Sequence, residues 1–139
     1  MITKKVNRYY CEFCKKANCS ASSISRHETS CTLNPNRICR MCAIFDLEQP
    51  QMSDLIKILP TPVITDDDMG FLTVINIKEI ESAMEKLRSV TENCPACILA
   101  TIRQMGIPVP AITSFNFSEE CKSWWADFNE AQADINYIY

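Results

Sequence analysis

The chain has 139 residues, of which 47% are hydrophobic. It is long enough for one ordinary domain or two very small ones, and too apolar for extended disorder. It has no apolar run of about 18 residues and no apolar stretch behind its basic N-terminus, so we expect neither a membrane span nor a secretory signal. Residues 1–42 hold eight Lys and Arg against two Glu, whereas residues 43–139 hold six against fifteen acidic residues. The first part therefore suits a polyanion, which the second would repel.

The nine cysteines are the most informative feature of the composition. Without an export signal we expect a cytoplasmic, reducing location, where paired cysteines bind metal more often than they form disulfides. Three C-x-x-C pairs occur, at Cys11/Cys14, Cys39/Cys42 and Cys94/Cys97.

The first predicted element is a metal module around the only histidine. Cys11, Cys14, His27 and Cys31 have the spacing C-x2-C-x12-H-x3-C. A C-x-x-C turn directs two thiolates at one centre, and positions 27 and 31 share one face of a helix. Four such ligands close a tetrahedral zinc site. The alternatives are a surface histidine among free cysteines, and Cys19 in place of one ligand. The first is disfavoured because so small a segment has little else to fold around.

Residues 11–31 resemble the zinc fingers that carry two cysteines followed by histidine and cysteine. Tyr9 and Ile24 stand where such fingers carry an aromatic and a large aliphatic residue, although the usual phenylalanine is absent. The resemblance implies a β-hairpin followed by a helix. It also places the base-contacting positions of that helix at Ser20, Ser22, Ser23 and Arg26.

Three serines and one arginine are poorly suited to bidentate contacts with bases. We therefore expect non-specific contact with nucleic-acid phosphates, principally through Lys15, Lys16 and Arg26. The alternatives are a solvated basic surface and one that docks on the acidic part of the same chain.

The second predicted metal site is split along the sequence. Cys39 and Cys42 are separated by 51 residues from Cys94 and Cys97, and together the two pairs give a four-cysteine zinc site. The second pair begins a predicted helix, whose N-terminus favours thiolate. The arrangement is similar to treble-clef zinc sites. Four buried core cysteines and a redox-active C-x-x-C are the alternatives.

Between the two cysteine pairs we expect a helix, a hairpin and a second helix. The first helix covers residues 53–59, capped by Ser53 and ended by Pro60. Strands at 63–65 and 71–75 flank a loop at 66–70. The second helix runs from 77 to about 92, with Asn76 as its cap and Glu79 at the capping-box position. Its apolar residues repeat at helical spacing: Ile77, Ile80, Met84, Leu87 and Val90.

Two further helices are predicted after Cys94. One continues from Cys97 to Gly106. The last begins after Ser118, and one broad face carries Cys121, Trp124, Trp125, Phe128, Ala131 and Ile135. Adjacent tryptophans on a helix point about 100° apart. Trp124 and Trp125 are therefore candidates for one core contact and one contact with a protein partner, with internal packing of both as the alternative.

These patterns predict a small zinc-stabilised α+β protein, with a finger module at residues 1–38 and a mostly helical region at 39–139 that contains one short β-hairpin. We expect two zinc ions and no enzyme activity, because the sole histidine is a ligand and both sites are closed. The predicted function is that of an adaptor or regulator that associates with nucleic acid through the basic finger. The first alternative is a protein-interaction or assembly component with purely structural zinc. The layout resembles small uncharacterised zinc-finger proteins of phages and bacteria, and the resemblance to phage proteins implies a virion-associated location as an alternative. A thiol-redox enzyme using Cys94 is a third hypothesis.

Overall fold

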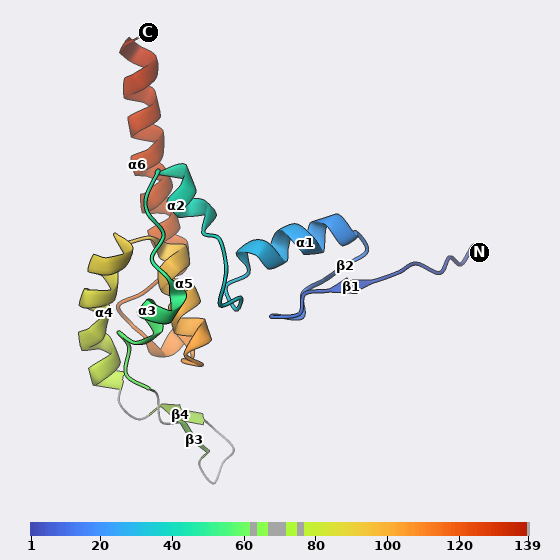
Figure 1. The fold of residues 1–139 in the computed structure, drawn as a ribbon, viewed down its shortest axis with the longest axis horizontal. Helices are drawn as coiled ribbons and strands as arrows, with labels where there is room; N and C mark the ends of the chain where they lie inside the picture. Colours follow the sequence, from blue (N-terminus) through green and yellow to red (C-terminus); the bar gives the residue numbers. More distant parts are fainter. Residues whose placement is uncertain (62–63, 67–71, 75–76, 139) are drawn as a thin grey trace.

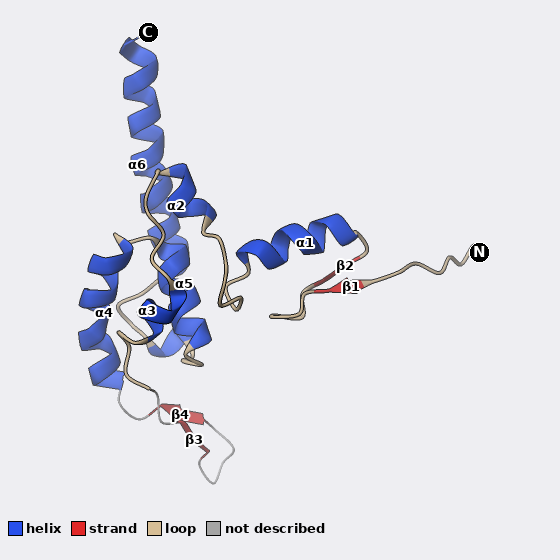
Figure 2. Cartoon of the chain, viewed as in Figure 1, coloured by secondary structure: helices blue, strands red, loops and turns tan. Residues whose placement is uncertain are grey.

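The computed structural model describes residues 1–61, 64–66, 72–74 and 77–138, and gives the backbone alone for 64–66, 72–74 and 131–138. Within these ranges the chain forms six α-helices, one short 3-10 helix and two antiparallel two-stranded sheets (Figure 2). The predicted α+β class, with a finger hairpin and a mostly helical remainder, is confirmed.

The finger, residues 9–31, is built from a hairpin and one helix. Strands β1 (Tyr9–Tyr10) and β2 (Ala17–Asn18) pair antiparallel, and α1 (Ala21–Ser30) follows. Ser20 caps α1, because its Oγ accepts a hydrogen bond from the Ser23 N–H at 3.3 Å. Ile24 is the buried residue of this helix. Burying one such side chain contributes only about 1.5–3 kcal/mol, so the finger needs a further source of stability.

The helical body, residues 39–138, is assembled around α5. It contains α2 (Arg40–Ile44), α3 (Met52–Ile56), α4 (Ile77–Thr91), α5 (Pro95–Gln104), the 3-10 helix η1 (Val109–Ala111) and α6 (Phe117–Ile138). Helix α5 packs against α3, α4 and α6, and it is buried on several sides, which explains its nearly continuous apolar sequence. Strands β3 (Ile64–Asp66) and β4 (Leu72–Val74) form a separate hairpin.

The finger projects to one side of the body, and the N-terminus lies at its far end (Figure 1). Helix α6 continues past α2, so its C-terminal end stands away from the other helices. The linker after Cys31 lies against the end of α5. There Gln104 Nε2 donates to the carbonyls of Thr32 and Asn34 at 2.9 and 3.0 Å, and Arg103 donates to Thr32 Oγ1 at 2.8 Å.

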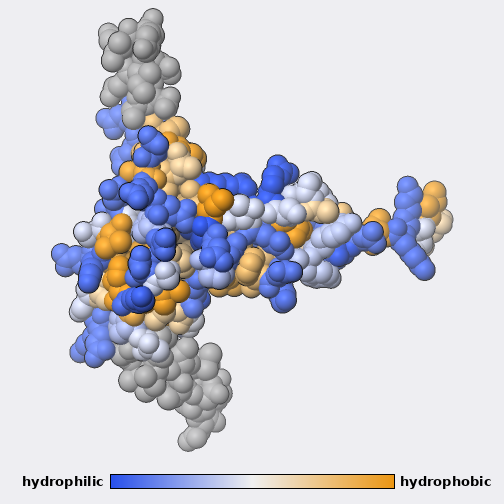
Figure 3. Space-filling model, viewed as in Figure 1, coloured by the Kyte–Doolittle hydropathy of each residue, from blue (hydrophilic) through white to orange (hydrophobic). Residues whose placement is uncertain are grey.

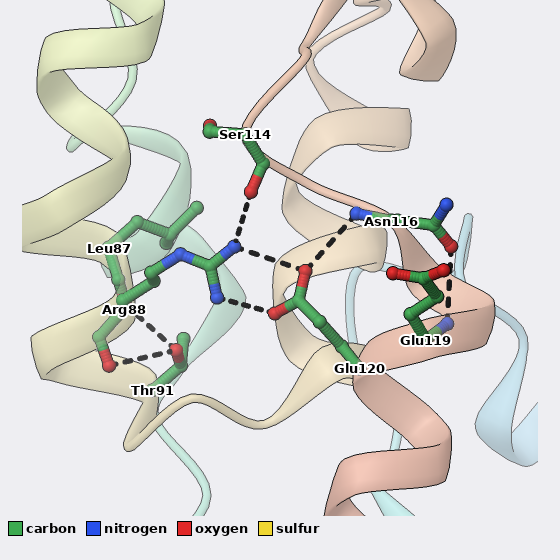
Figure 4. A network of polar contacts seen from close by, with 7 residues as sticks. All are labelled: Leu87, Arg88, Thr91, Ser114, Asn116, Glu119 and Glu120. Carbon is green, nitrogen blue, oxygen red and sulfur yellow. Dashed lines mark hydrogen bonds and ion pairs between the residues drawn. The ribbon is translucent and has the colours of Figure 1, made fainter.

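One polar network joins α4 to the start of α6 (Figure 4). Arg88 forms an ion pair with Glu120 and also donates to the carbonyl of Ser114 at 2.8 Å. Asn116 caps α6, since its Oδ1 accepts from the Glu119 N–H at 3.1 Å, while its own N–H donates to Glu120 at 3.2 Å. This cap begins α6 at Phe117, so the predicted start after Ser118 is slightly too late.

Several other predicted boundaries need correction. Helix α3 begins at Met52 and ends at Ile56, because the chain tightens there through a bond from the Ile58 N–H to the Leu55 carbonyl. Ser53 is therefore inside the helix, and the cap position belongs to Gln51. Asp66 is part of β3, not of the loop. The rest of that predicted loop, 67–70, and the predicted cap Asn76 lie outside the described residues.

The predicted apolar stripe of α4 is correct except at its end. Ile80, Met84 and Leu87 are buried, Ile77 is half-buried, but Val90 is 43% exposed. Thr91 is buried in its place, and its hydroxyl donates to the Leu87 carbonyl at 2.8 Å. The chain leaves the helix through two residues with positive φ, Glu92 and Asn93.

Candidate metal centres and a basic hollow

The first cluster joins the finger's turn to its helix. The ligand atoms of Cys11, Cys14, His27 and Cys31 all lie within 4.8 Å of one another. The two cysteines of the C-x-x-C pair lie in a tight turn closed by bonds from the Cys11 N–H to the Lys16 carbonyl and from the Lys15 N–H to the Cys11 carbonyl. His27 is in the last turn of α1, and its Nε2 lies 3.0 Å from Cys14 Sγ.

The second cluster lies inside the body. Cys39, Cys42, Cys94 and Cys97 are all buried, and their sulfurs lie within 4.8 Å of one another. The Cys39–Cys94 and Cys42–Cys97 sulfur distances are 3.5 and 3.6 Å. Zinc with four sulfurs at ~2.3 Å sets tetrahedral sulfurs about 3.8 Å apart, so the cluster already has nearly the required size. All four cysteines are free, which leaves four thiol ligands.

Both pairs of the second cluster are positioned by helix starts. Cys94 occupies the N-cap of α5, with Pro95 at the first helical position. Cys39 occupies the N-cap of α2, and its sulfur accepts from the Cys42 N–H at 3.4 Å. Sequence reasoning identified only the helix after the second pair, because α2 is too short to show a helical periodicity.

The pKa values of the cysteine thiols indicate that a metal must displace protons when it binds. Hydrogen bonds from Cys42, Cys94 and Cys97 lower the pKa of the Cys39 thiol, and the bond to Cys39 raises the pKa of Cys42. In the finger, burial raises the pKa of Cys31 to about 11. A metal-free cluster therefore does not hold its full set of thiolates, and a bound cation must take the place of protons.

The donor sets and their packing fit zinc. Tetrahedral sites of sulfur, or of sulfur with imidazole nitrogen, are typical of structural zinc, and neither cluster leaves an open position. The chain thus has two Cys/His clusters that can bind a zinc ion each. Cys19 is exposed and lies outside both. Cys121 is half-buried, and burial raises its pKa.

Two of the three predicted phosphate-binding residues lie around one hollow beside the first cluster. Lys16 and Arg26 line it together with Arg40, and its volume is about 280 Å³. Arg40 comes from α2, and its guanidinium donates to the Arg26 carbonyl at 3.1 Å. Ser23, His27 and Ser30 complete the lining. Lys15 is exposed in the adjacent turn, with a φ of 65°, and does not line the hollow.

Arg40 was missed by sequence reasoning, since nothing in the sequence indicates that α2 approaches the finger helix. In the part of the chain that the structure describes, the only ion pair is Arg88–Glu120. No basic side chain of the finger is paired there with the acidic part of the chain. Hydrophilic side chains cover much of the visible face of the finger (Figure 3).

The two tryptophans of α6 have different surroundings. Trp124 is half-buried against the body's core, with its ring centroid 4.5 Å from that of Phe45. Trp125 is 39% exposed and meets Phe128 edge-on at 5.6 Å. The predicted core contact is thus made by Trp124, whereas the predicted contact of the other tryptophan with a protein partner stays a prediction. Ala131 and Ile135 belong to the residues for which only the backbone is described.

Comparison of the chain with protein-family models, with curated proteins and with solved structures found no match. The similarity to phage zinc-finger proteins therefore stays a prediction. Among the described residues, no helix combines the length and the apolar character that crossing a membrane requires. The two clusters and the basic hollow are accordingly the features of the described residues that bear on function.

Proposed function

We propose that the protein is a non-catalytic, zinc-stabilised adaptor that binds nucleic-acid phosphates through its finger. The observation that carries the proposal is the hollow lined by Lys16, Arg26 and Arg40, with two serines and no carboxylate in its wall. Guanidinium and ammonium groups converging on one space form charge-assisted hydrogen bonds with phosphate oxygens. The zinc ions hold the surface in shape, and neither takes part in a reaction.

Binding is expected to be independent of base sequence. Ser20, at the first base-contacting position, is occupied in capping α1. A single finger covers about three base pairs, and Ser22 and Ser23 offer only hydroxyls to base edges. Affinity then depends on neutralised phosphates, and it falls steeply with salt.

The test is binding of the zinc-loaded full chain to a 20-base-pair DNA or RNA duplex, measured by anisotropy across a salt series. Each neutralised phosphate contributes about −0.9 to the slope of log K against log salt on DNA, so three cations give a slope of about −3. The double variant Lys16→Gln/Arg26→Gln should weaken binding and make the slope shallower by about 2.

A matched control removes the same charge elsewhere. Lys86→Gln/Lys122→Gln changes two exposed lysines of the body and should leave affinity and slope close to those of the unchanged protein. Equal effects of the two double variants, or no binding at low salt with both zinc ions retained, would overturn the proposal.

The second candidate is a protein-interaction or assembly component in which zinc is purely structural. The exposed ring of Trp125 on the projecting helix α6 favours it. Under this alternative the finger binds no duplex at any salt concentration. Trp125→Ala separates the two candidates further: it should leave duplex binding unchanged under the first candidate and impair function under the second.

A further inference from the structure

Arg37 is the charged residue that the proposed function does not use. It lies in the linker between the two clusters, and only 6% of its surface is exposed. Among the described residues no other charged side chain is buried. Its Nη1 lies 3.9 Å from Cys97 Sγ, within hydrogen-bond range for sulfur, and its Nε has no hydrogen-bond partner.

A buried guanidinium needs a nearby negative charge. Arginine keeps its proton in proteins, so it cannot avoid the desolvation cost by becoming neutral. Among the described residues no carboxylate supplies the charge, because the one ion pair there joins Arg88 to Glu120. The neighbour that Arg37 does touch is a ligand sulfur of the second cluster.

Four thiols carry no net charge, whereas four thiolates around a divalent zinc ion carry two negative charges. We propose that Arg37 is the outer-sphere counter-ion of a zinc tetrathiolate at Cys39, Cys42, Cys94 and Cys97. Its N–H donates to the Cys97 sulfur, and its charge compensates half of the net charge of the centre. The proposal rests on metal binding at the second cluster and is independent of any contact with nucleic acid.

The backbone around Arg37 is fixed from two directions. Gln49 Nε2 donates to the Arg37 carbonyl at 2.7 Å, while the Oε1 of the same amide accepts from the Cys39 N–H. The Arg37 N–H donates to the Asn34 carbonyl at 3.2 Å. The guanidinium is thus held against the sulfur by a linker whose position depends on the same residue, Gln49, that orients Cys39.

This arrangement has a chemical consequence at the sulfur. A donated hydrogen bond and an adjacent positive charge withdraw electron density from a thiolate, which makes it a poorer nucleophile. Outer-shell partners of metal ligands typically change metal affinity by about 10–100-fold. Removing the Arg37 charge should therefore speed zinc loss from the second cluster and leave the first cluster unaffected.

The experiment compares Arg37→Met, Arg37→Lys and Arg103→Met with the unchanged full chain, loaded with zinc or with ¹¹³Cd. The control Arg103 binds the same linker through Thr32 Oγ1, a hydroxyl oxygen and not a sulfur. ¹¹³Cd NMR resolves a four-sulfur site from a three-sulfur, one-nitrogen site. Zinc release to a chelator gives a kinetic phase for each site. The phase that disappears in Cys11→Ser belongs to the first cluster, and the remaining phase gives the release rate of the second.

The expected result is a shifted four-sulfur ¹¹³Cd signal and about tenfold faster release from that site in Arg37→Met. Arg37→Lys should restore slow release in part, and Arg103→Met should behave like the unchanged chain. If Arg37→Met binds too little zinc at the second cluster for a rate to be measured, Arg37→Lys tests the proposal instead. Zinc binding at the second cluster of Arg37→Lys would support a role for the positive charge, and a loss of zinc equal to that in Arg37→Met would overturn it. Unchanged release in Arg37→Met, or equal acceleration by Arg103→Met, would also overturn the proposal.

Discussion

The nine free cysteines occupy three kinds of surroundings. Seven belong to the two clusters, Cys19 is exposed beside the finger helix, and Cys121 is half-buried on α6. Cys14 and Cys19 are close in sequence, yet only Cys14 contacts His27. Sequence spacing alone left open which of them is the ligand, because a flexible turn could present either sulfur.

The first prediction uses this pair. Cys14→Ser should leave one zinc ion per chain, because three remaining ligands no longer close the first site. Cys19→Ser should leave two, since its side chain is outside both clusters. Native mass spectrometry counts the ions directly. Loss of an ion from Cys19→Ser, or retention of both in Cys14→Ser, would show that the structure assigns the wrong sulfur.

The second prediction concerns pH. Burial raises the pKa of Cys31 to about 11, so in the metal-free chain this thiol is protonated at neutral pH. Zinc binding must then release its proton, and affinity falls as pH falls, by about tenfold per pH unit for each proton released. Calorimetric zinc titration in two buffers of different ionisation enthalpy measures the proton count. A count of zero at the first site would contradict the assignment.

The metal ligands were predictable from their spacing in the sequence, whereas residues that are positioned by tertiary contacts were not. The ligand sets follow from C-x-x-C turns and from the helical separation of His27 and Cys31, which are local geometry. Arg37 and Arg40 carry no local signal. Their positions beside Cys97 and Arg26 depend on how the linker and α2 fold back, which no periodicity in the sequence encodes.

At the scale of elements, the contact between α4 and α6 depends on Arg88 and Glu120. The pair is partly exposed, with side-chain exposures of 26% and 22%, so solvent screening limits its strength. The Glu120 carboxylate also accepts the Asn116 N–H at 3.2 Å and thereby links the contact to the start of α6.

The third prediction is a double-mutant cycle with Arg88→Gln and Glu120→Gln. We expect a coupling energy of about 0.5–1 kcal/mol in urea unfolding of the zinc-loaded protein. It should shrink at high salt, since screening weakens a partly exposed pair. The control pair Lys86→Gln and Glu85→Gln carries exposed charges on the same helix. A coupling at 88 and 120 no larger than that of the control would contradict the network.

Element types were easier to predict than element ends. Three buried residues at helical spacing, Ile80, Met84 and Leu87, were sufficient to place α4. Its end was misjudged because Thr91 replaces Val90 in the core, through a hydroxyl that is satisfied by the Leu87 carbonyl. The start of α6 was misjudged because the cap at Asn116 depends on Glu119 and Glu120, where no apolar pattern yet exists.

At the scale of the whole molecule, the two clusters differ in what surrounds them. The cysteines of the second cluster belong to the same core as Leu55, Met84 and Ile98, whereas those of the first do not. In the finger, Ile24 is the only buried apolar residue besides Cys11 and Cys31. Structural zinc contributes about 10–16 kcal/mol in finger peptides, several times the contribution of one isoleucine.

The last prediction follows from this difference. In Cys11→Ser the finger should unfold by itself, and α4 and α5 should keep their protection in hydrogen exchange measured by mass spectrometry. In Cys94→Ser a polar, unligated group replaces a sulfur at the N-cap of α5, inside the body's core. Protection should then be lost in α2 and α5 and lowered in α4, which packs on α5.

The two variants are each other's control, because each removes one zinc ligand by the same substitution. Loss of α5 protection in Cys11→Ser as large as in Cys94→Ser would mean that the finger and the body unfold as one unit. Retention of α5 protection in Cys94→Ser would mean that apolar packing alone holds the body. If α5 loses protection in Cys94→Ser but not in Cys11→Ser, the first metal site stabilises only the finger, and the second holds together parts of the body that are distant in the sequence.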